Sequence, residues 1–279
     1  MKVIESIQNS QAPQVSVEII PPKRGANIVA FHEALESIQP FNPPFVNVTS
    51  HAADVQWEER TDGTFRKRTR RKSPGTFGLC AVIKYKYGIE PVPHLLCAGF
   101  TREETEDALI ELNYLGIENV LAIRGDGKPK KVSRSERSCN RYALDLVQQV
   151  VNMNQGIYQE QMIDAAKTSF SVGVSAYPEK HFESPNPMFD LEILKRKQDA
   201  GAHFAVTQMF YDNQKYFDYC ARARKFGITI PIIPGLKILT RKKQLTSIPR
   251  IFHVDLPYEL SQSIMEAKDN AEVRNIGIE

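Results

Sequence analysis

The sequence lacks a long apolar run, and its mean hydropathy of -0.36 gives no indication of a membrane-spanning helix. Its first residues, MKVIESIQNSQAPQ, also lack an apolar core of signal-peptide length, which favours a cytosolic, cytoplasmic protein. Cysteine is scarce. The four cysteines stand singly, without the close pairs of thiolate zinc sites or a dense disulfide pattern, so we expect reduced thiols and no metal. Basic residues exceed acidic ones by only three, 36 against 33, too few to indicate a nucleic-acid partner.

The remaining composition is that of a globular protein. Hydrophobic residues make up 42% and charged residues 25% of the 279 positions, enough apolar chain for one large barrel or two medium domains. Strand-like and helix-like patterns alternate along the sequence. The predicted strands cover residues 15–20, 45–49, 91–97, 119–124, 170–176, 203–208 and 228–233. The predicted helices cover residues 26–39, 101–115, 142–151, 188–199, 214–225, 240–248 and 256–267, and another follows Gly75.

Regular alternation of this kind leaves two architectures, a doubly wound open sheet and a β/α barrel. No G-x-G-x-x-G or P-loop follows the first strand, and polar residues stand at the carboxyl ends of many strands instead of in one crevice. These strand-end residues are Thr49, His94, Arg124 with Asp126, Tyr177 and Gln208. The pattern favours a TIM-type (β/α)8 barrel, in which the chemistry lies at the carboxyl ends of the strands.

The first predicted strand carries a carboxylate in its middle. Its sequence, VSVEIIPP at residues 15–22, alternates β-branched residues and ends at two prolines that cannot continue a sheet ladder. Glu18 lies on the face opposite to the valines. An edge strand with a solvent-facing glutamate is one interpretation. In an α/β protein whose sheet is covered on both faces, Glu18 is instead expected to be buried or semi-buried.

A long charged segment interrupts the alternation at residues 57–75. Its basic run, Arg66 to Lys72, allows a localisation signal or a nucleic-acid patch as one interpretation. The sequence favours a solvated loop, because no aromatic stacking platform accompanies the run and because Glu58, Glu59 and Asp62 offset its charge. Residues 128–140 predict a second polar loop.

Eight motifs, in order, resemble those of the methylenetetrahydrofolate reductases. They span residue 15 to about residue 244 and read VEIIPP, FVNVTSHA, PVPHLLC, LAIRGD, SAYPEKH, LKRKQDAGA, FAVTQMFYD and IIPGL. The resemblance implies an FAD-containing β/α barrel forming a single domain over residues 1–279. It also implies the reduction of methylenetetrahydrofolate to methyltetrahydrofolate with NADH or NADPH, a step of one-carbon metabolism and methionine biosynthesis.

The resemblance also assigns catalytic and substrate-binding roles. Glu18 matches the family's general acid, since opening the methylene bridge requires a proton on the leaving nitrogen, and burial would raise its pKa towards working pH. Asp126 matches a carboxylate beside flavin and pterin, where its charge would disfavour anionic reduced flavin. Gln208 matches a residue that contacts folate and nicotinamide in turn, which suits an amide with both a donor and an acceptor. Gln244 matches a second glutamine of the folate site.

A larger set of residues falls on flavin-contact positions of the family. Arg196 and Lys197 would suit the diphosphate, and Asp190 a ribose hydroxyl or an amine, although LKRKQD also reads as a salt-bridged helix face. The set comprises Thr49, Ser50, Ala52, His94, Arg124, Gly125, Asp126, Tyr142, Ala143, Tyr177, His181, Asp190, Arg196 and Lys197.

The sequence departs from the family in several places. Ser50 stands where some relatives have tyrosine, and Ile248 where some have an aromatic residue near the folate aryl ring. The family continues into a final helix and an eighth strand, whereas this sequence stops at Glu279. We therefore expect seven barrel strands, with the first and the seventh bordering a gap.

Two other functions stay open. A truncated, non-catalytic barrel could serve as an interaction subunit, and a flavin barrel could oxidise or reduce another substrate. The sequence does not distinguish NADH from NADPH, and it leaves a homo-oligomer open.

Overall fold

The computed structural model describes residues 1–52, 54–70, 73–125 and 138–279, without the side chains of residues 54–56 and 69–70. The chain divides into two compact units, residues 1–173 and 174–279. The expectation of a single domain therefore stays a prediction.

The first unit alternates strands and helices. Its strands are β1 (Val17–Ile19), β2 (Phe45–Val48), β3 (Asp54–Glu59), β4 (Phe65–Arg70), β5 (Glu90–Leu96), β6 (Asn119–Ile123) and the start of β7 (Ser171–Ala176). Its helices are α1 (Val3–Asn9), α2 (Val29–Ile38), the short 3-10 turn η1 (Gln39–Phe41), α3 (Thr76–Tyr87), α4 (Arg102–Tyr114) and α5 (Ala143–Asn154).

The second unit continues the alternation and ends in helices. Its strands are the end of β7, then β8 (Phe204–Thr207) and β9 (Ile232–Ile233). Its helices are α6 (Pro187–Asp199), α7 (Asn213–Lys225), α8 (Gln244–Phe252), α9 (Tyr258–Glu266) and α10 (Asn270–Ile278). No described helix combines the length and the apolarity needed to cross a bilayer.

The seven main strands follow one another without a reversal, in the order β1-β2-β5-β6-β7-β8-β9. The pairs β1–β2, β2–β5, β5–β6 and β8–β9 are parallel. A doubly wound sheet would reverse its order at a switch point, whereas a β/α barrel winds in one direction. The strand order thus confirms the predicted barrel type, and β1 and β9 are its two end strands, as predicted.

Local sequence signals explain where the helices of the first unit begin and end. Thr101 and Glu104 form the predicted capping box, in which the Thr101 side chain accepts the Glu104 N–H at 3.1 Å and Glu104 accepts the Thr101 N–H at 2.8 Å. Gly116, with φ of 60°, follows α4 in the left-handed conformation that stops a helix. Both signals are confirmed.

Helix α1, which the sequence analysis did not identify, is attached at the amino end of β6. The buried Asn119 side chain accepts the Val3 N–H at 2.8 Å and donates to the Met1 carbonyl oxygen at 3.0 Å. Val3 itself is only 1% exposed. The helix therefore covers the end of the sheet opposite to the polar strand ends.

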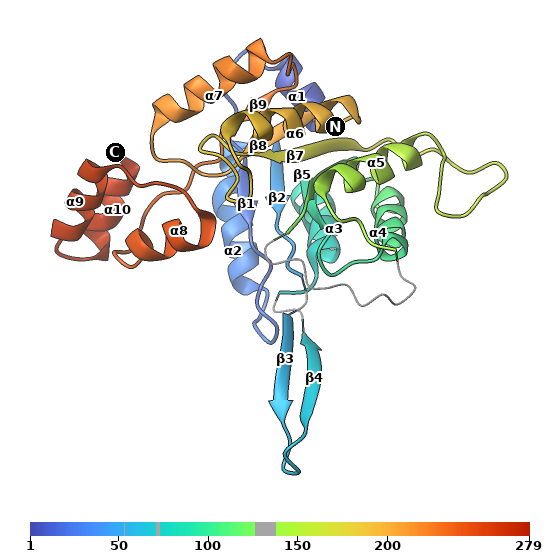
Figure 1. Ribbon diagram of the computed structural model, residues 1–279, viewed down its shortest axis with the longest axis horizontal. Coiled ribbons are helices and arrows are strands. Elements are labelled where there is room, and N and C mark those ends of the chain that lie inside the picture. The colour runs from blue at the N-terminus through green and yellow to red at the C-terminus, as the bar shows by residue number, and fades with distance from the viewer. Residues whose placement is uncertain (53, 71–72, 126–137) are drawn as a thin grey trace. The chain divides into compact units, whose positions relative to one another are not determined.

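The charged segment predicted to be a loop at residues 57–75 is largely a β-hairpin, so that prediction is wrong. Strands β3 and β4 pair in antiparallel fashion from Asp54↔Arg70 to Glu59↔Phe65 (Figure 1). The turn explains the pairing, because Gly63 has φ of 77° and donates to the Arg60 carbonyl oxygen at 2.9 Å. A type I turn followed by a left-handed glycine is a common three-residue hairpin connection.

Helices α8, α9 and α10 of the second unit share a small apolar core. Its buried members are Leu239, Ile248, Val254, Ile264, Ala267 and Val273. Helix α8 begins at Gln244 and not at residue 240 as predicted, because the Gln244 side-chain oxygen accepts the N–H groups of Thr240 at 2.7 Å and Arg241 at 2.8 Å. Residues 240–243 are thus held as a turn that leads into the helix.

Two glycines provide a test of the packing in each unit. A Cβ at Gly235 would lie 2.2 Å from the Thr207 carbonyl oxygen, whereas a Cβ at Gly78, inside α3, would meet no atom within 4 Å. We expect Gly235→Ala to lower the free energy of unfolding by about 1–3 kcal/mol and Gly78→Ala to raise it by about 0.5–1 kcal/mol. Urea denaturation measures both, and the same sign for the two variants would contradict the described packing.

Candidate functional site

The strand register of the first unit places the predicted polar residues on one sheet face. Glu18 lies opposite Asn47, and Val48 lies opposite Pro93, so the next residue, Thr49, continues the register opposite His94. Residues two apart on a strand share a face. Glu18, Asn47, Thr49 and His94 therefore lie on the same face, towards the carboxyl ends of β1, β2 and β5.

Three buried polar atoms on this face have no hydrogen-bond partner among the described residues. They are Asn47 Oδ1, Thr49 Oγ1 and His94 Nε2. Leaving such an atom unsatisfied costs about 1–3 kcal/mol, and native structures contain few of them. Since three occur together on one face, the arrangement has the chemistry expected of a surface built to bind a polar ligand.

His94 is held neutral by its surroundings. Burial lowers its pKa to about 4, and the positive charge of His51 when protonated acts in the same direction. Its Nε2 atom lies 3.7 Å from Glu18 Oε2, a contact that would raise the pKa. Burial prevails over this contact, because the His94 side chain is 7% exposed whereas Glu18 is largely in solvent.

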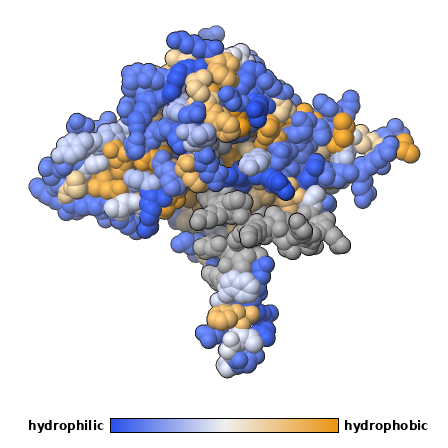
Figure 2. Space-filling view, viewed as in Figure 1, coloured by the Kyte–Doolittle hydropathy of each residue, from blue (hydrophilic) through white to orange (hydrophobic). Residues whose placement is uncertain are grey.

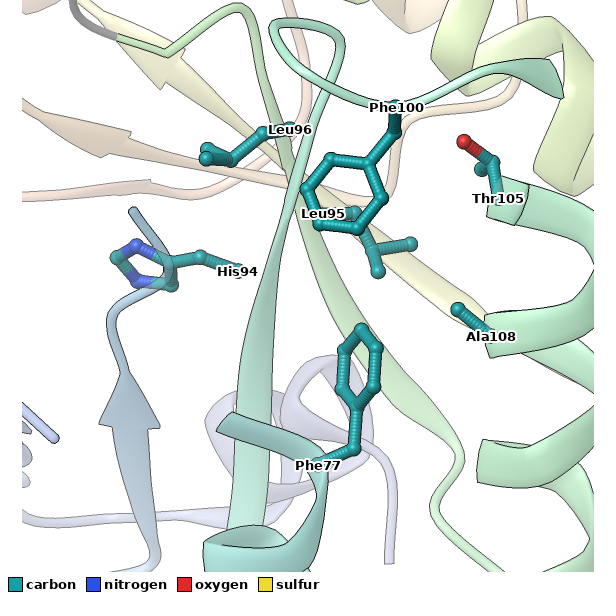
Figure 3. Close-up of a pocket in the computed structure, with 7 residues that line it drawn as sticks. All are labelled: Phe77, His94, Leu95, Leu96, Phe100, Thr105 and Ala108. Atoms are coloured by element: carbon teal, nitrogen blue, oxygen red, sulfur yellow. The ribbon is translucent and has the colours of Figure 1, made fainter. Parts of the chain in front are cut away.

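Figure 3 shows which side chains lie on each side of β5. His94 and Leu96 point to one side, and Leu95 points to the other with Phe77 and Phe100. The cavity on the second side has a volume of only about 10 Å³, at the lower limit for one water molecule. It is a packing gap between β5 and the helices, and we assign it no ligand.

A larger cavity, of about 250 Å³, lies beyond the carboxyl end of β2. Polar groups from both sides of the β2–α3 connection line it, including Ser50, His51, Ser73 and Thr76. Ser50 was predicted to contact flavin, and Ala52, two residues later, is half-buried. Thr76 donates from its hydroxyl to the Thr49 carbonyl oxygen at 3.0 Å, which connects the cavity wall to the strand end.

The end of β6 brings Arg124 and Gly125 beside the end of β5. The Ala98 N–H donates to the Arg124 carbonyl oxygen at 3.0 Å, and Gly125 has φ of 89° with Ala98 Cβ 3.4 Å from where its own Cβ would be. The turn therefore requires glycine. Asp126, predicted to be catalytic and to bind substrate and cofactor, lies outside the described residues, as does most of the predicted loop at residues 128–140.

Tyr142 and Ala143 lie at the start of α5. Tyr142 is the residue before the helix, its side chain is exposed, and its N–H donates to Asp145 Oδ2 at 3.0 Å. Ala143 is buried as the first helical residue. Both are thus at a helix amino end, where unpaired N–H groups favour anionic ligands.

The loop after β7 in the second unit holds Tyr177, His181 and Asp190 together. Tyr177 and His181 form an edge-to-face ring pair with centroids 4.8 Å apart. The buried Asp190 accepts the His181 N–H at 2.6 Å and also the Ser184 hydroxyl. Both Asp190 oxygens therefore bind the loop itself, a role that the sequence analysis did not identify.

Arg196 and Lys197 differ in their surroundings, although both were predicted to suit a diphosphate. Lys197 is buried and donates to the Ser175 carbonyl oxygen at 3.2 Å, whereas Arg196 is exposed. Adjacent helical residues do not share a face. Lys197 thus supports the end of β7, and Arg196 is the cation that α6 presents to solvent.

The two predicted folate glutamines make local contacts in the second unit. Gln208 is half-buried, and its side-chain oxygen accepts the Met209 N–H at 3.1 Å. Its own N–H donates to the Ala176 carbonyl oxygen at 2.8 Å, which fixes the end of β8 beside that of β7. Gln244 uses its side-chain oxygen in the turn before α8, as described above.

The structure adds residues that the sequence analysis missed. Asn47 shares the polar face, and the alternation in FVNVT could have indicated this, since Asn47 and Thr49 are two residues apart. In the second unit, Glu179 accepts Lys215 Nζ at 2.9 Å and the Asp255 N–H at 2.8 Å. No sequence signal identifies this link between distant segments.

The prediction that Glu18 is buried or semi-buried is wrong. Its side chain is 57% exposed. The physical reason is its strand, because β1 has three residues and stands at one end of the strand order, so strand neighbours cover it on one side only. Glu18 remains on the polar face, 3.7 Å from the buried His94.

The neutral state of His94 predicts a pH dependence of stability. Its folded-state pKa, about 4, lies below the ordinary 6.5, so the unfolded chain binds the proton more readily between these values. The stability contributed by neutral His94 is present above pH 6.5 and is lost as the pH falls towards 4. We expect flavin-free His94→Gln to lose less stability than the parent over this range, measured by urea denaturation. Parallel curves would contradict the burial of His94.

Comparisons with known proteins identify the family. The family model described as methylenetetrahydrofolate reductase matches residues 3–279. Methylenetetrahydrofolate reductase 2 of Saccharomyces cerevisiae is 29% identical over 288 residues, covering 99% of this chain and 43% of the yeast protein. The 5,10-methylenetetrahydrofolate reductase of Salmonella typhimurium is 30% identical over 267 residues, covering 94% of this chain and 77% of that protein. The chain thus spans less than half of the yeast relative.

A solved structure shares the fold. It is that of an uncharacterized protein from Clostridium thermocellum that binds two copies of 5-methyl-5,6,7,8-tetrahydrofolic acid, with a TM-score of 0.59 and 12% identity, covering 98% of this chain and 84% of that one. At this identity the likeness concerns the fold alone. Because the family model covers nearly the whole sequence and 30% identity extends over most of the Salmonella protein, the chain belongs to the methylenetetrahydrofolate reductase family.

Proposed function

We propose that the protein reduces 5,10-methylenetetrahydrofolate to 5-methyltetrahydrofolate with NADH or NADPH, using FAD as its cofactor. The observation that carries the proposal is the polar face of the first unit, where Asn47, Thr49 and His94 each bury an unsatisfied polar atom beside Glu18. Family membership supports the substrate, since the relatives bear that name.

The residues of the polar face fit a flavin in their chemistry. A flavin ring system is flat and presents both hydrogen-bond donors and acceptors at its edge, and a hydroxyl, an amide and a neutral imidazole match both kinds. Bound FAD would supply the hydride that reduces the substrate's methylene carbon. The neutral state of His94 keeps one ring nitrogen as a donor and the other as an acceptor, without adding a charge beside the cofactor.

Glu18 is the proposed general acid. The reaction breaks one bond between the methylene carbon and nitrogen, and it adds one proton to that nitrogen and one hydride to that carbon. The carboxylic acid of Glu18 would donate the proton and regain it from solvent in the next cycle. Because Glu18 is exposed in this structure, bound substrate would have to provide the apolar cover that its strand does not.

The family's other roles remain part of the proposal. Asp126 would hydrogen-bond the pterin and restrain negative charge on the reduced cofactor. In the second unit, Gln208 and Gln244 are proposed folate contacts. The proposed flavin contacts there are Tyr177, His181, Asp190, Arg196 and Lys197. Asp190 and Lys197 would act partly through the loop and the strand end that they hold.

The colour of the protein provides the first experimental test. Purified protein, or protein reconstituted with FAD, should show a flavin absorbance spectrum that NADH or NADPH bleaches. Methylenetetrahydrofolate should then restore the absorbance and yield methyltetrahydrofolate. A colourless protein that cannot be reconstituted would instead support a non-catalytic interaction subunit.

Thr49→Val separates ligand binding from folding. Valine has nearly the shape of threonine but lacks the buried, unsatisfied hydroxyl. Removing such a group should raise the unfolding free energy of the flavin-free protein by about 1–2 kcal/mol, while FAD binding weakens about tenfold. Urea denaturation and FAD titration measure the two effects. A variant that loses stability and keeps its FAD affinity would show that the hydroxyl serves the fold.

Glu18→Gln tests the proposed acid. The variant should bleach with NADH or NADPH at nearly the parent rate, because this half-reaction needs no proton on folate. Reoxidation by methylenetetrahydrofolate should slow by about a hundredfold or more, as is typical for a lost general acid. Rapid-mixing absorbance resolves both steps. Glu33→Gln, an exposed position on α2, is the matched control, and equal slowing of both half-reactions in Glu18→Gln would indicate a structural role.

A further inference from the structure

The segment of residues 54–72, which contains the hairpin β3–β4, carries the whole excess of positive charge in the sequence. Residues 54–72 contain seven basic and four acidic residues, out of 36 and 33 in the full sequence, so the remainder is balanced at 29 of each. The two strands also differ from each other. Strand β3 contains three acidic and no basic residues, and β4 contains four basic and no acidic ones. All the basic residues of the two hairpin strands therefore lie on one of them, β4.

Strand β4 has an open edge among the described residues. It pairs with β3 alone, in a sheet of two strands. The Arg60 N–H donates to the Thr64 carbonyl oxygen at 2.8 Å, so the pair Glu58↔Arg66 is the next to exchange ladder hydrogen bonds. Hydrogen-bonded and non-hydrogen-bonded pairs alternate along the ladder, so Phe65 and Lys67, on either side of Arg66, direct their backbone N–H and C=O groups away from β3. An extended chain could bond to them.

The two faces of the hairpin differ in chemistry. Trp57, Phe65 and Lys67 share one face, and Arg66, Arg68 and Glu58 share the other. Trp57 is 63% and Phe65 62% exposed, which is large for aromatic side chains, and a two-stranded ribbon has no second layer to cover them. Arg68 is paired with Glu58 at 2.7 Å, but this pair is exposed and contributes little. Figure 2 shows the hairpin as mostly hydrophilic with an apolar spot.

We propose that the open edge of β4 binds an acidic, extended protein segment by strand addition. The partner would hydrogen-bond to the backbone of Phe65 and Lys67. Because side chains of an added strand alternate between faces, its acidic residues would stand next to Arg66 and Arg68, and its apolar residues next to Phe65 and Lys67. The structure thus specifies a partner segment in which acidic and apolar residues alternate.

Charge argues against the two other candidate occupants. In a second copy, β4 pairing with β4 would oppose Arg66, Lys67 and Arg68 to like charges, which is how natural edge strands avoid self-association. A nucleic-acid strand lying across the ribbon would meet Glu58 and Glu59 on β3 as well as the basic residues. A peptide strand lies beside β4 only, and it alone can use the edge hydrogen bonds.

The single tryptophan of the chain is Trp57, so its fluorescence reports on the hairpin directly. The probe is an eight-residue peptide of alternating glutamate and valine, titrated into the 279-residue chain. We expect a saturable shift of the Trp57 emission, because the added strand extends the face that Trp57 shares with Phe65 and Lys67. The matched control peptide is N-methylated at alternate residues on its bonding edge. This control has the same charge but cannot form backbone hydrogen bonds to β4, so it should not shift the Trp57 emission.

Variants of β4 separate charge from strand addition. Arg66→Gln with Arg68→Gln should weaken peptide binding about tenfold at low salt. Lys67→Gln removes one charge, and Lys67→Pro also removes an outward N–H, so the proline variant should bind about fivefold more weakly than the glutamine variant. The peptide comparison does not depend on these variants, which keeps the test valid if Lys67→Pro disturbs the hairpin.

Several outcomes would overturn the proposal. Equal binding of the two peptides would show that general electrostatic attraction, and not strand addition, accounts for the binding. No emission shift at millimolar peptide would show that the peptide does not bind. Tighter binding of a single-stranded RNA of the same charge would favour nucleic acid as the occupant. A shift that depends on protein concentration alone would favour a second copy.

Discussion

The parallel pairing of β2 between β1 and β5 is the constraint on which the candidate site depends. It sets the register that puts Glu18 opposite Asn47 and continues to Thr49 opposite His94. A slip of one residue would turn every one of these side chains to the other face of the sheet, among the buried apolar residues that face the helices. Val46 and Val48, which are fully buried, hold β2 in place, since the alternative register would expose them. Apolar burial on one face therefore fixes polar chemistry on the other.

This arrangement has an energetic consequence. Each unsatisfied buried atom costs about 1–3 kcal/mol, and a net stability of about 5–15 kcal/mol is usual for a domain. The polar face thus lowers stability by an amount that apolar packing must offset, and a ligand that supplies the missing hydrogen bonds would recover it. His94 shows the same balance. Burial keeps it neutral despite Glu18 nearby, so the face presents dipoles and a single carboxylate instead of an ion pair.

Sequence patterns predicted the strands and most helices well because the helices bury one face, which gives a period of 3.6, and the central strands are buried on both faces, which gives nearly continuous apolar runs. The same signal failed where burial is absent. Glu18 was expected inside because an average strand of such a sheet is covered, but a three-residue end strand is not. The hairpin was predicted to be a loop because charged residues dominate both strands, and the apolar residues Trp57 and Phe65 are too few to form a stripe. The contacts of Asp190 with Ser184, six positions away, and of Glu179 with Lys215, 36 positions away, depend on loop conformation, on which single-sequence patterns carry no information.

The place of the hairpin in the chain explains how one fold can contain both the polar face and the hairpin. Thr49 and Thr76 are 27 positions apart, and the Thr76 hydroxyl donates to the Thr49 carbonyl oxygen. The chain thus returns, at the first residue of α3, to the strand end that it left. The entropic cost of a closed loop grows only slowly with its length, so an insertion of this size adds little to the cost of folding. The hydrogen bond therefore joins the two ends of the segment that contains the hairpin. The side chains of the hairpin can therefore be substituted to suit a partner without altering the register of β1, β2 and β5, which determines the polar face.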